Sequence, residues 1–311
     1  MKIFDGHTHI TVGKCDYLAL FNYDILSLIT DMKINNVEKS IVSANPFVKS
    51  VFCPNDCRVT CVYASESDYK LCSQDCRYKN KHRTKIRIVK IDTEELYCSC
   101  CGYVIYSDND PYRYLNDELI NETSNYEKII PLCSLPLLKK NQQNEIERCE
   151  TIYKDRFAGY KIHINVTGRR FTNYEIPTKK TLLLHTNGDE DGVHNYIELA
   201  SRQQGNIVLA HGFLFGSDNL KKLSKCENIY IDISAMSASK SANGYHNLKA
   251  RTYENAIKKI LDKFDYTRII FGSDARFSPM ERELEDFLNT ELTLNIKKTI
   301  LYDNVVNAYK L

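Results

Sequence analysis

The sequence predicts one (β/α)8 TIM barrel, an α/β fold, with a small cysteine-rich insertion, and three observations support this fold class. Apolar runs typical of buried strands alternate with amphipathic, helix-like stretches along most of the chain. Four of these runs end at a histidine or an aspartate. The chain has 311 residues, of which 43% are hydrophobic, enough to build a barrel of about 250 residues and an insertion.

Eight strands are expected in chain order, each a short run dominated by apolar residues. They span residues 2–7, 40–44, 128–133, 157–163, 181–186, 206–211, 229–234 and 268–273. Helices are expected at residues 17–35, 144–154, 250–264 and 299–311. In the first of these, Leu18, Phe21, Ile25, Leu28 and Ile29 follow helical spacing. Strands that alternate with helices in this way favour a parallel barrel.

Potential metal ligands lie at the ends of four of the expected strands. They are His7 and His9, His185, His211, and Asp274. Side chains at the C-terminal ends of barrel strands converge on one rim. The His-x-His pair is the most specific signal, because alternate residues of a strand point the same way. Imidazole and carboxylate groups suit Zn, Mn or Fe(II), so the sequence predicts a metal centre at the mouth of the barrel.

Composition excludes some classes of protein and leaves others open. A net charge of +2 does not indicate a strongly acidic or basic partner. We expect no membrane association, because no stretch approaches the ~18 apolar residues that a membrane-spanning helix needs. The first strand begins close to residue 1 without the pattern of a signal peptide, so a cytoplasmic protein is expected. In that compartment, the 12 cysteines would be reduced thiols or metal ligands before disulfides.

Several segments together resemble the amidohydrolase superfamily of metal-dependent hydrolases, and most of all its amidohydrolase-related branch, amidohydrolase 2. The opening Asp-Gly-His-Thr-His at residues 5–9 carries the resemblance, as does Phe-Gly-Ser-Asp at residues 271–274. Further matching segments are residues 159–163, 184–186, 209–212, 230–234 and 300–309. The resemblance covers nearly all of the chain outside residues 46–107. It implies an enzyme with a barrel of this type.

The resemblance also implies roles for the strand-end residues. His7, His9, His185 and Asp274 would bind the metal, which would be Zn, or Mn or Fe, as one or two ions. Asp274 would also take a proton from a metal-activated water and deliver it to the leaving group. His211 would either bind a second ion or face the substrate carbonyl and stabilise an oxyanion.

Three further residues have alternative interpretations. In several relatives a fourth-strand lysine is carboxylated and bridges two ions, and Lys161 occupies a similar Gly-Tyr-Lys-Ile-His segment. Pairing of Lys161 with a carboxylate, or a contact with substrate, is the favoured alternative. His163 points the same way two residues later and could bind substrate. Arg276 is either an anchor for an anionic substrate group or a surface residue.

The segment between the second and third strands departs from the family pattern. We expect residues 1–45 and 108–311 to form the barrel, and residues 46–107 to form a zinc-ribbon-like insertion. Cysteine pairs at zinc-ligand spacing indicate a structural zinc ion, with one or two ions possible. These pairs are Cys53 and Cys57, Cys72 and Cys76, and Cys98 and Cys101. An iron–sulfur cluster is the second alternative for these cysteines, and disulfides are the third.

A basic segment at residues 77–90 lies between the cysteine pairs. It could contact nucleic acid or a phosphorylated substrate, although a solvated strand face is favoured.

For the whole protein, the leading expectation is a hydrolase that cleaves an amide, cyclic amide, ester or lactone bond of a small molecule. A non-oxidative decarboxylase of the same superfamily is the second expectation, and a TatD-like metal-dependent nuclease the third. Lys161 argues against the nuclease interpretation, because TatD-like nucleases usually have a glutamate on the fourth strand.

Overall fold

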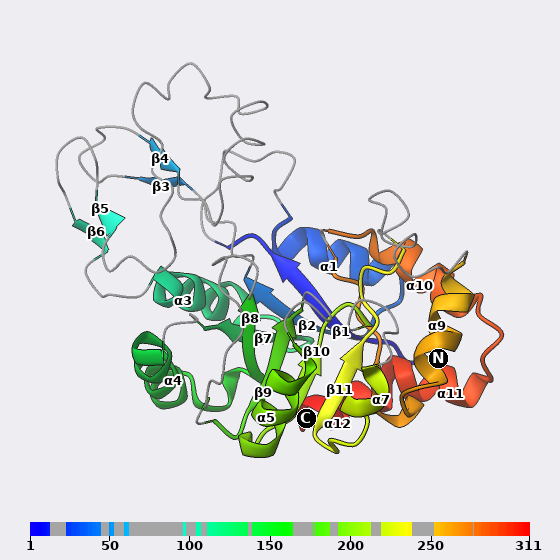
Figure 1. Ribbon diagram of the computed structural model, residues 1–311. Helices are drawn as coiled ribbons and strands as arrows, with labels where there is room; N and C mark the ends of the chain where they lie inside the picture. The colour runs from blue at the N-terminus through cyan, green and yellow to red at the C-terminus, as the bar shows by residue number, and fades with distance from the viewer. Residues whose placement is uncertain are drawn as a thin grey trace.

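Eight parallel strands form a single sheet in the computed structural model of the chain (Figure 1). The order is β1 (Phe4–Ile10), β2 (Lys39–Ala44), β7 (Ile129–Ser134), β8 (Gly159–His163), β9 (Thr181–His185), β10 (Ile207–Leu209), β11 (Ile229–Asp232) and β12 (Ile269–Ile270). The structure describes residues 1–12, 23–44, 50–52, 59–61, 96–97, 104–106, 111–135, 139–163, 176, 178–186, 192–212, 219–237, 252–275 and 277–311.

The sheet closes between β1 and the residues that follow β12. Gly6 N–H donates to the carbonyl of Phe271 at 2.9 Å, and Asp274 N–H donates to the carbonyl of His7 at 2.8 Å. An isolated parallel bridge joins Thr8 to Ala275 one step further on. These bonds complete the barrel and confirm the predicted (β/α)8 fold. Because the closing seam runs through His7 and Asp274, two predicted site residues are held together by the backbone.

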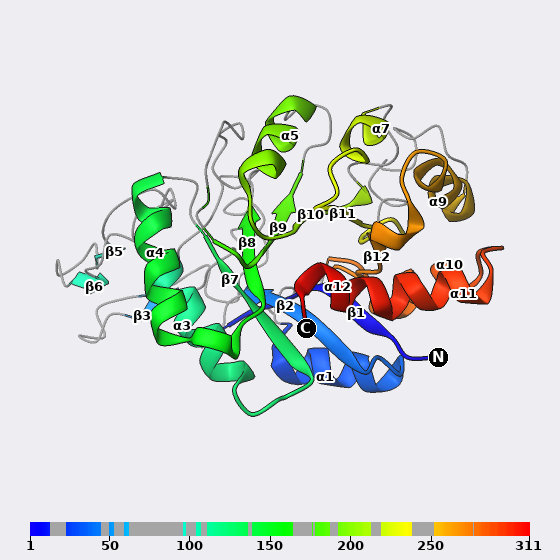
Figure 2. The ribbon, with the colours of Figure 1, turned by 90° about the horizontal axis from the view of Figure 1, so that it is seen from below.

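Helices surround the barrel, as the view from below shows (Figure 2). They are α1 (Ile25–Ile34), α3 (Pro111–Thr123), α4 (Lys139–Ile152), α5 (Val193–Arg202), α7 (Leu220–Leu223), α9 (Tyr253–Leu261), α10 (Met280–Leu288), α11 (Leu294–Lys298) and α12 (Asn304–Tyr309). Shorter helical turns are η1 (Lys154–Arg156), η5 (Tyr266–Arg268) and η6 (Thr299–Asp303), the last of which is a π-helix. The expected strands and helices all have counterparts, with shifted ends.

The first expected helix is shorter than its apolar periodicity predicts. Asp24 is its N-cap, with a side chain that accepts from Ser27 N–H at 2.8 Å, and the helix begins at Ile25. The expected start at residue 17 is therefore wrong, since residues 23 and 24 are not helical. An aspartate that caps a helix overrides the apolar periodicity that precedes it. Residues 17–22 of this expected helix lie outside the described part of the chain.

The buried apolar residues form an outer and an inner cluster. The outer cluster fills the space between the strands and the surrounding helices. The inner cluster fills the barrel and includes Phe4, Leu183 and Ile270 from the strands and Val305 and Tyr309 from α12. Thus α12 closes the N-terminal end of the barrel from below. The interior at the opposite, C-terminal end holds polar groups instead.

Two short antiparallel hairpins lie in the sequence range of the predicted insertion. They pair β3 (Ser50–Phe52) with β4 (Val59–Cys61), and β5 (Leu96–Tyr97) with β6 (Val104–Tyr106). The predicted zinc ligands lie outside the described residues: Cys53, Cys57, Cys72, Cys76, Cys98 and Cys101. The zinc-ribbon insertion and the division into a barrel and an insertion therefore stay predictions.

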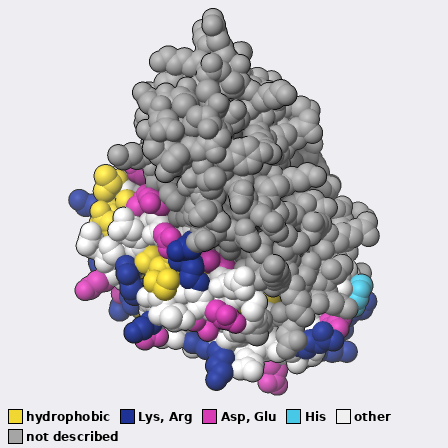
Figure 3. Space-filling model, turned by 90° about the vertical axis from the view of Figure 1, so that its left-hand side faces the viewer, with side chains coloured by type: hydrophobic (Ala, Val, Ile, Leu, Met, Phe, Trp, Pro, Cys, Tyr) yellow, Lys and Arg dark blue, Asp and Glu magenta, His cyan; other side chains and the backbone are white. Residues whose placement is uncertain are grey.

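The described surface carries charges of both signs. On the face in Figure 3, Lys and Arg side chains alternate with Asp and Glu, with small hydrophobic groups between them. This mixture agrees with the net charge of +2. None of the helices in the described ranges combines the length and the apolar character that crossing a membrane requires.

Candidate metal centre

A β-bulge in β1 aims two histidines into the barrel. The pairing of β1 with β2 shifts by one residue between Asp5 and Thr8. Phe4 packs inside the barrel, so strict alternation would send Gly6 and Thr8 inward and the histidines outward. The extra residue reverses this phase, and His7 and His9 face the interior. Because His7 and His9 are alternate residues that follow this register shift, both rings point into the same part of the barrel interior.

Neighbouring groups hold this bulge in place. One carboxylate oxygen of Asp5 accepts from His7 N–H at 3.1 Å and from Ser273 N–H at 2.9 Å. Burial raises the pKa of Asp5 to about 7, although these hydrogen bonds act in the opposite direction. A Cβ on Gly6 would lie 2.8 Å from the carbonyl oxygen of Phe271. Glycine is therefore required where the two ends of the sheet meet.

Three buried side chains form a group with the geometry of a metal site. The Nε2 atoms of His7 and His9 are 3.1 Å apart, and Asp274 Oδ1 lies 3.2 Å from His9 Nε2 and 3.6 Å from His7 Nε2. Their potential ligand atoms all lie within 4.8 Å of one another. Ligands of a tetrahedral ion at about 2.0–2.1 Å lie about 3.3 Å apart, so the spacing fits a bound ion. No other such group occurs among the described residues.

The second nitrogen of each imidazole contacts a fixed oxygen. His7 Nδ1 lies 2.5 Å from Asp232 Oδ2, and His9 Nδ1 lies 2.9 Å from Ser43 Oγ. Such contacts orient the rings of metal-binding histidines so that Nε2 points toward the ion. Burial raises the pKa of Asp232 well above its usual range, and the positive charge of Lys161 acts in the opposite direction. The donor set and its orientation therefore both fit a metal ion.

Asp232 and Ser43 are site residues that the sequence analysis did not assign. Asp232 and Ser234 alternate on the interior face at the end of β11, and both contact His7 Nδ1. The signal was present, because the Asp-Ile-Ser segment ends an apolar run in the same way as the histidine segments. Ser43 gave no comparable signal, since a lone serine in a strand is common in any sheet.

Lys161 lies at the same point. Its side chain is fully buried, and its Nζ is 2.8 Å from His7 Nε2. Burial lowers the pKa of Lys161 to about 8, and the carboxylates of Asp274 and Asp232 act in the opposite direction. The lysine thus reaches the inner end of the histidine and aspartate group.

His185 and His211 form a second pair beside the first group. His185 Nδ1 lies 3.0 Å from His211 Nε2, and Ser234 Oγ lies 3.1 Å from His211 Nδ1. Burial lowers the pKa of His185 well below its usual value and that of His211 to about 4, so both rings are neutral near pH 7. His185 is less buried than its neighbours and lies outside the compact three-residue group.

The backbone is strained where two of these strands end. His211 and Asp274 have φ angles of 60° and 56°, in the left-handed region that residues other than glycine rarely adopt. Such strain persists where the surrounding structure imposes it, and it is common at functional sites. Here the strained residues are two predicted site residues, His211 beside His185 and Asp274 beside His9.

Two predicted site residues are only partly described. His163 is the last residue of β8 and pairs in register with His185, but its side chain lies outside the described part of the structure. Arg276 also lies outside it. The roles predicted for these two residues stay predictions.

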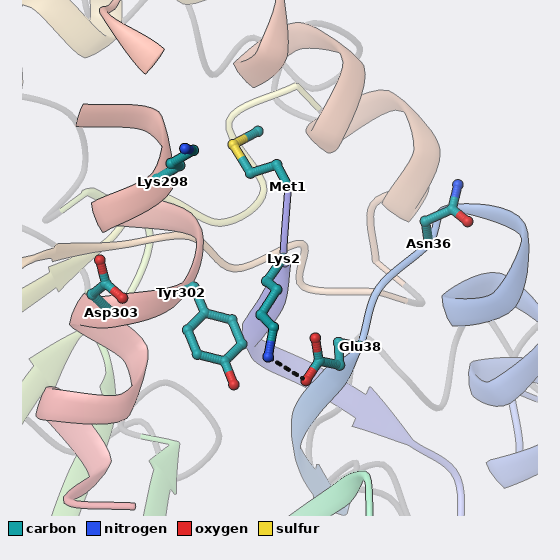
Figure 4. Close-up of a pocket in the computed structure, with 7 residues that line it drawn as sticks. All are labelled: Met1, Lys2, Asn36, Glu38, Lys298, Tyr302 and Asp303. Carbon is teal, nitrogen blue, oxygen red and sulfur yellow. Dashed lines mark ion pairs between the residues drawn. The ribbon is translucent and has the colours of Figure 1, made fainter. Parts of the chain in front are cut away.

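A hollow of about 550 Å³ lies at the other end of the barrel (Figure 4). Its lining residues are Met1, Lys2, Asn36, Glu38, Lys298, Tyr302 and Asp303. Lys2 and Glu38 form an ion pair there at 3.5 Å. None of the strand-end histidines lines it, so it is separate from the candidate metal centre.

The fold and this centre define a class of protein, a (β/α)8 barrel with a metal-type site at its C-terminal end. Residues 184–311 match a family model described as Amidohydrolase. A comparison with curated proteins gave no match. The family match runs from the end of β9 through the last three strands and agrees with the resemblance that the sequence motifs carry, and solved structures of low sequence identity share the fold of the whole chain.

Several solved structures align with the whole chain, and three of them show the range of their described activities. A probable 2-pyrone-4,6-dicarboxylic acid hydrolase from Acinetobacter baumannii is 11% identical, with a TM-score of 0.60 and 100% of both chains covered. A dihydroxybenzoic acid decarboxylase from Polaromonas sp. JS666, with bound manganese and the inhibitor 2-nitroresorcinol, is 11% identical, with a TM-score of 0.59 and 97% of its chain covered. A 5-carboxyvanillate decarboxylase from Sphingomonas paucimobilis is 10% identical, with a TM-score of 0.59 and 99% of its chain covered.

Proposed function

We propose that this protein is a metal-dependent, non-oxidative decarboxylase of a small carboxylic acid that carries a phenol or enol oxygen. The observation that carries the proposal is the buried group of His7, His9 and Asp274, with the amine of Lys161 2.8 Å from His7 Nε2. Two of the solved structures with this fold are decarboxylases of aromatic acids, one of them with manganese. This support raises decarboxylation above hydrolysis, which the sequence alone had favoured.

In this proposal His7, His9 and Asp274 hold the ion, and His185 completes the set from β9. When bound, the ion supplies a Lewis acid for the phenol or enol oxygen of the substrate. The donor set suits manganese as well as zinc. Buried residues around the site exclude water, which strengthens every charge interaction with the substrate.

The residues of the chain then supply the proton and the charge. Decarboxylation breaks the bond between the carboxylate carbon and its neighbour, and the electron pair stays on the neighbour, which must take up a proton. We assign delivery of that proton, which comes from solvent, to Asp274, whose Oδ1 lies 3.2 Å from His9 Nε2 on the side of the rings that faces the substrate in this proposal. Lys161 contributes positive charge close to the carboxylate. His211 is neutral near pH 7, so it serves as a hydrogen-bonding partner for the substrate and not as a cation.

Hydrolysis of a lactone, ester or amide bond is the second candidate function. A probable pyrone dicarboxylic acid hydrolase shares this fold along its whole length. The same Asp274 would then act as a base toward the attacking water, as the sequence analysis expects. The nuclease alternative depended on the basic segment at residues 77–90, which lies outside the described residues.

The test is a reaction screen of the protein loaded with Mn²⁺ or Zn²⁺ after metal removal. The substrates are 2,6-dihydroxybenzoate and 5-carboxyvanillate for decarboxylation, and 2-pyrone-4,6-dicarboxylate for hydrolysis. We expect release of CO₂ from an acid of the first kind, and its loss in Asp274→Asn at full metal occupancy. Ring opening of the pyrone without CO₂ release would favour the second candidate. An absence of metal at His7 and His9 would overturn both.

A further inference from the structure

A buried asparagine holds the backbone of Ser134 at the end of β7. Ser134 N–H donates to Asn116 Oδ1 at 2.7 Å, and Asn116 Nδ2 donates to the carbonyl of Ser134 at 3.0 Å. The pairing of β2 with β7 ends with Ser43 opposite Leu132. The amide of Asn116 therefore takes the place of the next peptide group of β2 and satisfies both backbone groups of Ser134.

A buried ionic network fixes that asparagine in turn. Asn116 on α3 is fully buried and donates to Glu145 Oε1 on α4 at 2.7 Å. Arg148 binds the same carboxylate through two nitrogens, at 2.6 and 2.8 Å, and also reaches Asp117 Oδ1 at 2.7 Å. A two-point contact of this kind sets geometry as well as energy. The network thus fixes the position of Asn116 against the end of β7.

The side chain of Ser134 faces the interior of the barrel, and no described residue hydrogen-bonds to its hydroxyl. It alternates with Leu132, which belongs to the inner cluster, and it pairs in register with Lys161 of β8. The residue is fully buried, yet its Oγ has no hydrogen-bond partner among the described residues. The other interior serines at this end differ, since Ser43 contacts His9 and Ser234 contacts His7.

A buried hydroxyl without a partner is costly, and such groups in native structures call for an explanation. A structural purpose does not explain it, because the hydroxyl holds nothing within the described structure. A ligand does explain it, since the hydroxyl lies on the strand next to that of Lys161 at the mouth of the barrel. A hydroxyl donor together with an ammonium group suits one oxygen-rich anionic group.

We propose that Ser134 is a substrate-binding residue whose hydroxyl donates to the carboxylate of the acid substrate, beside Lys161, with Asn116 as its positioning residue. This inference rests on the proposed function and names the subsite for the group that leaves as CO₂. The phenol or enol oxygen lies on the side of His7 and His9, and the carboxylate lies on the side of β7 and β8.

Ser134→Ala in the manganese-loaded protein tests the proposal, with Thr181→Val as the matched control. Thr181 is also a buried, inward-facing hydroxyl of a barrel strand, but it lies at the opposite end and donates to the carbonyl of Ala308 at 2.7 Å. Calorimetry measures the binding of 2,6-dihydroxybenzoate and of resorcinol, which lacks the carboxylate. Thermal unfolding of both variants is measured in parallel.

We expect Ser134→Ala to bind 2,6-dihydroxybenzoate about tenfold more weakly, a loss of about 1.4 kcal/mol. Its affinity for resorcinol and its melting temperature should not fall, because no internal hydrogen bond is lost. Thr181→Val should melt at a lower temperature and bind both compounds normally. A hydroxyl that serves the fold through a bound water gives the opposite result for Ser134→Ala, with lower stability and unchanged affinity, and this would overturn the inference.

The same measurements distinguish failure of the proposed function from failure of the Ser134 assignment. If the wild-type protein binds neither compound and releases no CO₂ from any acid in the screen, the proposed function and this subsite are both rejected. If the wild-type protein decarboxylates an acid while Ser134→Ala binds that acid equally well, only the assignment of Ser134 is rejected.

Discussion

The two ends of the barrel are built from the same eight strands but bury different kinds of groups. At the N-terminal end, Val305 and Tyr309 of α12 pack against apolar strand residues. At the C-terminal end, the strands bury histidines, carboxylates and Lys161. In barrels of this class the first end serves stability and the second serves function. The same contrast in buried groups occurs within one strand, because β9 begins at Thr181, which donates to the carbonyl of Ala308, and ends at His185, beside His211.

The two ends also differ in the hydrogen bonds of several buried polar groups. At the N-terminal end, Asn304 Nδ2 donates to the carbonyls of Tyr266 and Ile269 at 2.6 and 2.7 Å, and Tyr309 donates to the carbonyl of Gly6 at 2.9 Å. At the C-terminal end, Asp274 adopts a left-handed backbone, and Ser134 Oγ has no hydrogen-bond partner in the described part of the chain. These two unfavourable local features therefore lie where a ligand would compensate for them. Substitutions at the two ends should have separable effects.

The largest effect is expected for His9→Ala at the C-terminal end. Loss of this nitrogen removes one of the three grouped ligand atoms, and metal chemistry supplies several kcal/mol to a reaction barrier, so turnover should fall on the order of 1,000-fold. Bound metal per chain, measured by elemental analysis, should fall with it, while the melting temperature of the metal-free protein stays close to wild type. Full turnover with a normal metal content would remove His9 from the site.

Asp232→Asn should have the next largest effect. The carboxylate that orients His7 becomes a weaker partner, and such losses typically lower metal affinity about 10- to 100-fold. Competition with a chelator measures this affinity. Asp117→Asn is the control, because Asp117 pairs with Arg148 and is half exposed at its side chain. Equal metal affinity in the two variants would show that Asp232 does not orient a metal ligand.

Asn304→Ala should affect stability and leave the site unchanged. The substitution leaves two backbone carbonyls without their donor, so the free energy of unfolding should fall by about 2 kcal/mol. Denaturant unfolding measures the loss, and metal content with turnover per folded molecule measures the site. A parallel drop in metal affinity of tenfold or more would contradict the separation of the two ends.

Tyr309→Phe should give the smallest change. The ring stays packed in the barrel and only the hydrogen bond to Gly6 is lost, which costs about 1 kcal/mol. Burial raises the pKa of Tyr309 well above its usual value, so the hydroxyl is protonated and remains a donor near neutral pH. Because Gly6 belongs to the β1 bulge, a change in metal affinity here would show that the bulge couples the two ends.

Much of the fold could be predicted because its signals are local. Apolar runs gave all eight strands, and the residues directly after them gave His7, His9 and Asp274, which the structure brings together. A strand end fixes where its next side chain lies, once the strands are parallel and closed. The helix that begins at Ile25 was misplaced, because Asp24 caps it inside a periodic stretch.

Local sequence therefore determined which residues could serve as ligands, and only tertiary structure decided how they are held. The β1 bulge depends on the pairing of β1 with β2. The contact of Asp232 with His7 joins residues 225 positions apart, and the hydrogen bonds of Asn116 to Ser134 join residues 18 positions apart. Such contacts depend on strand register and helix packing, which no short segment specifies by itself. The sequence set the chemistry at each strand end, and the closing of the barrel set the distances that make it a site.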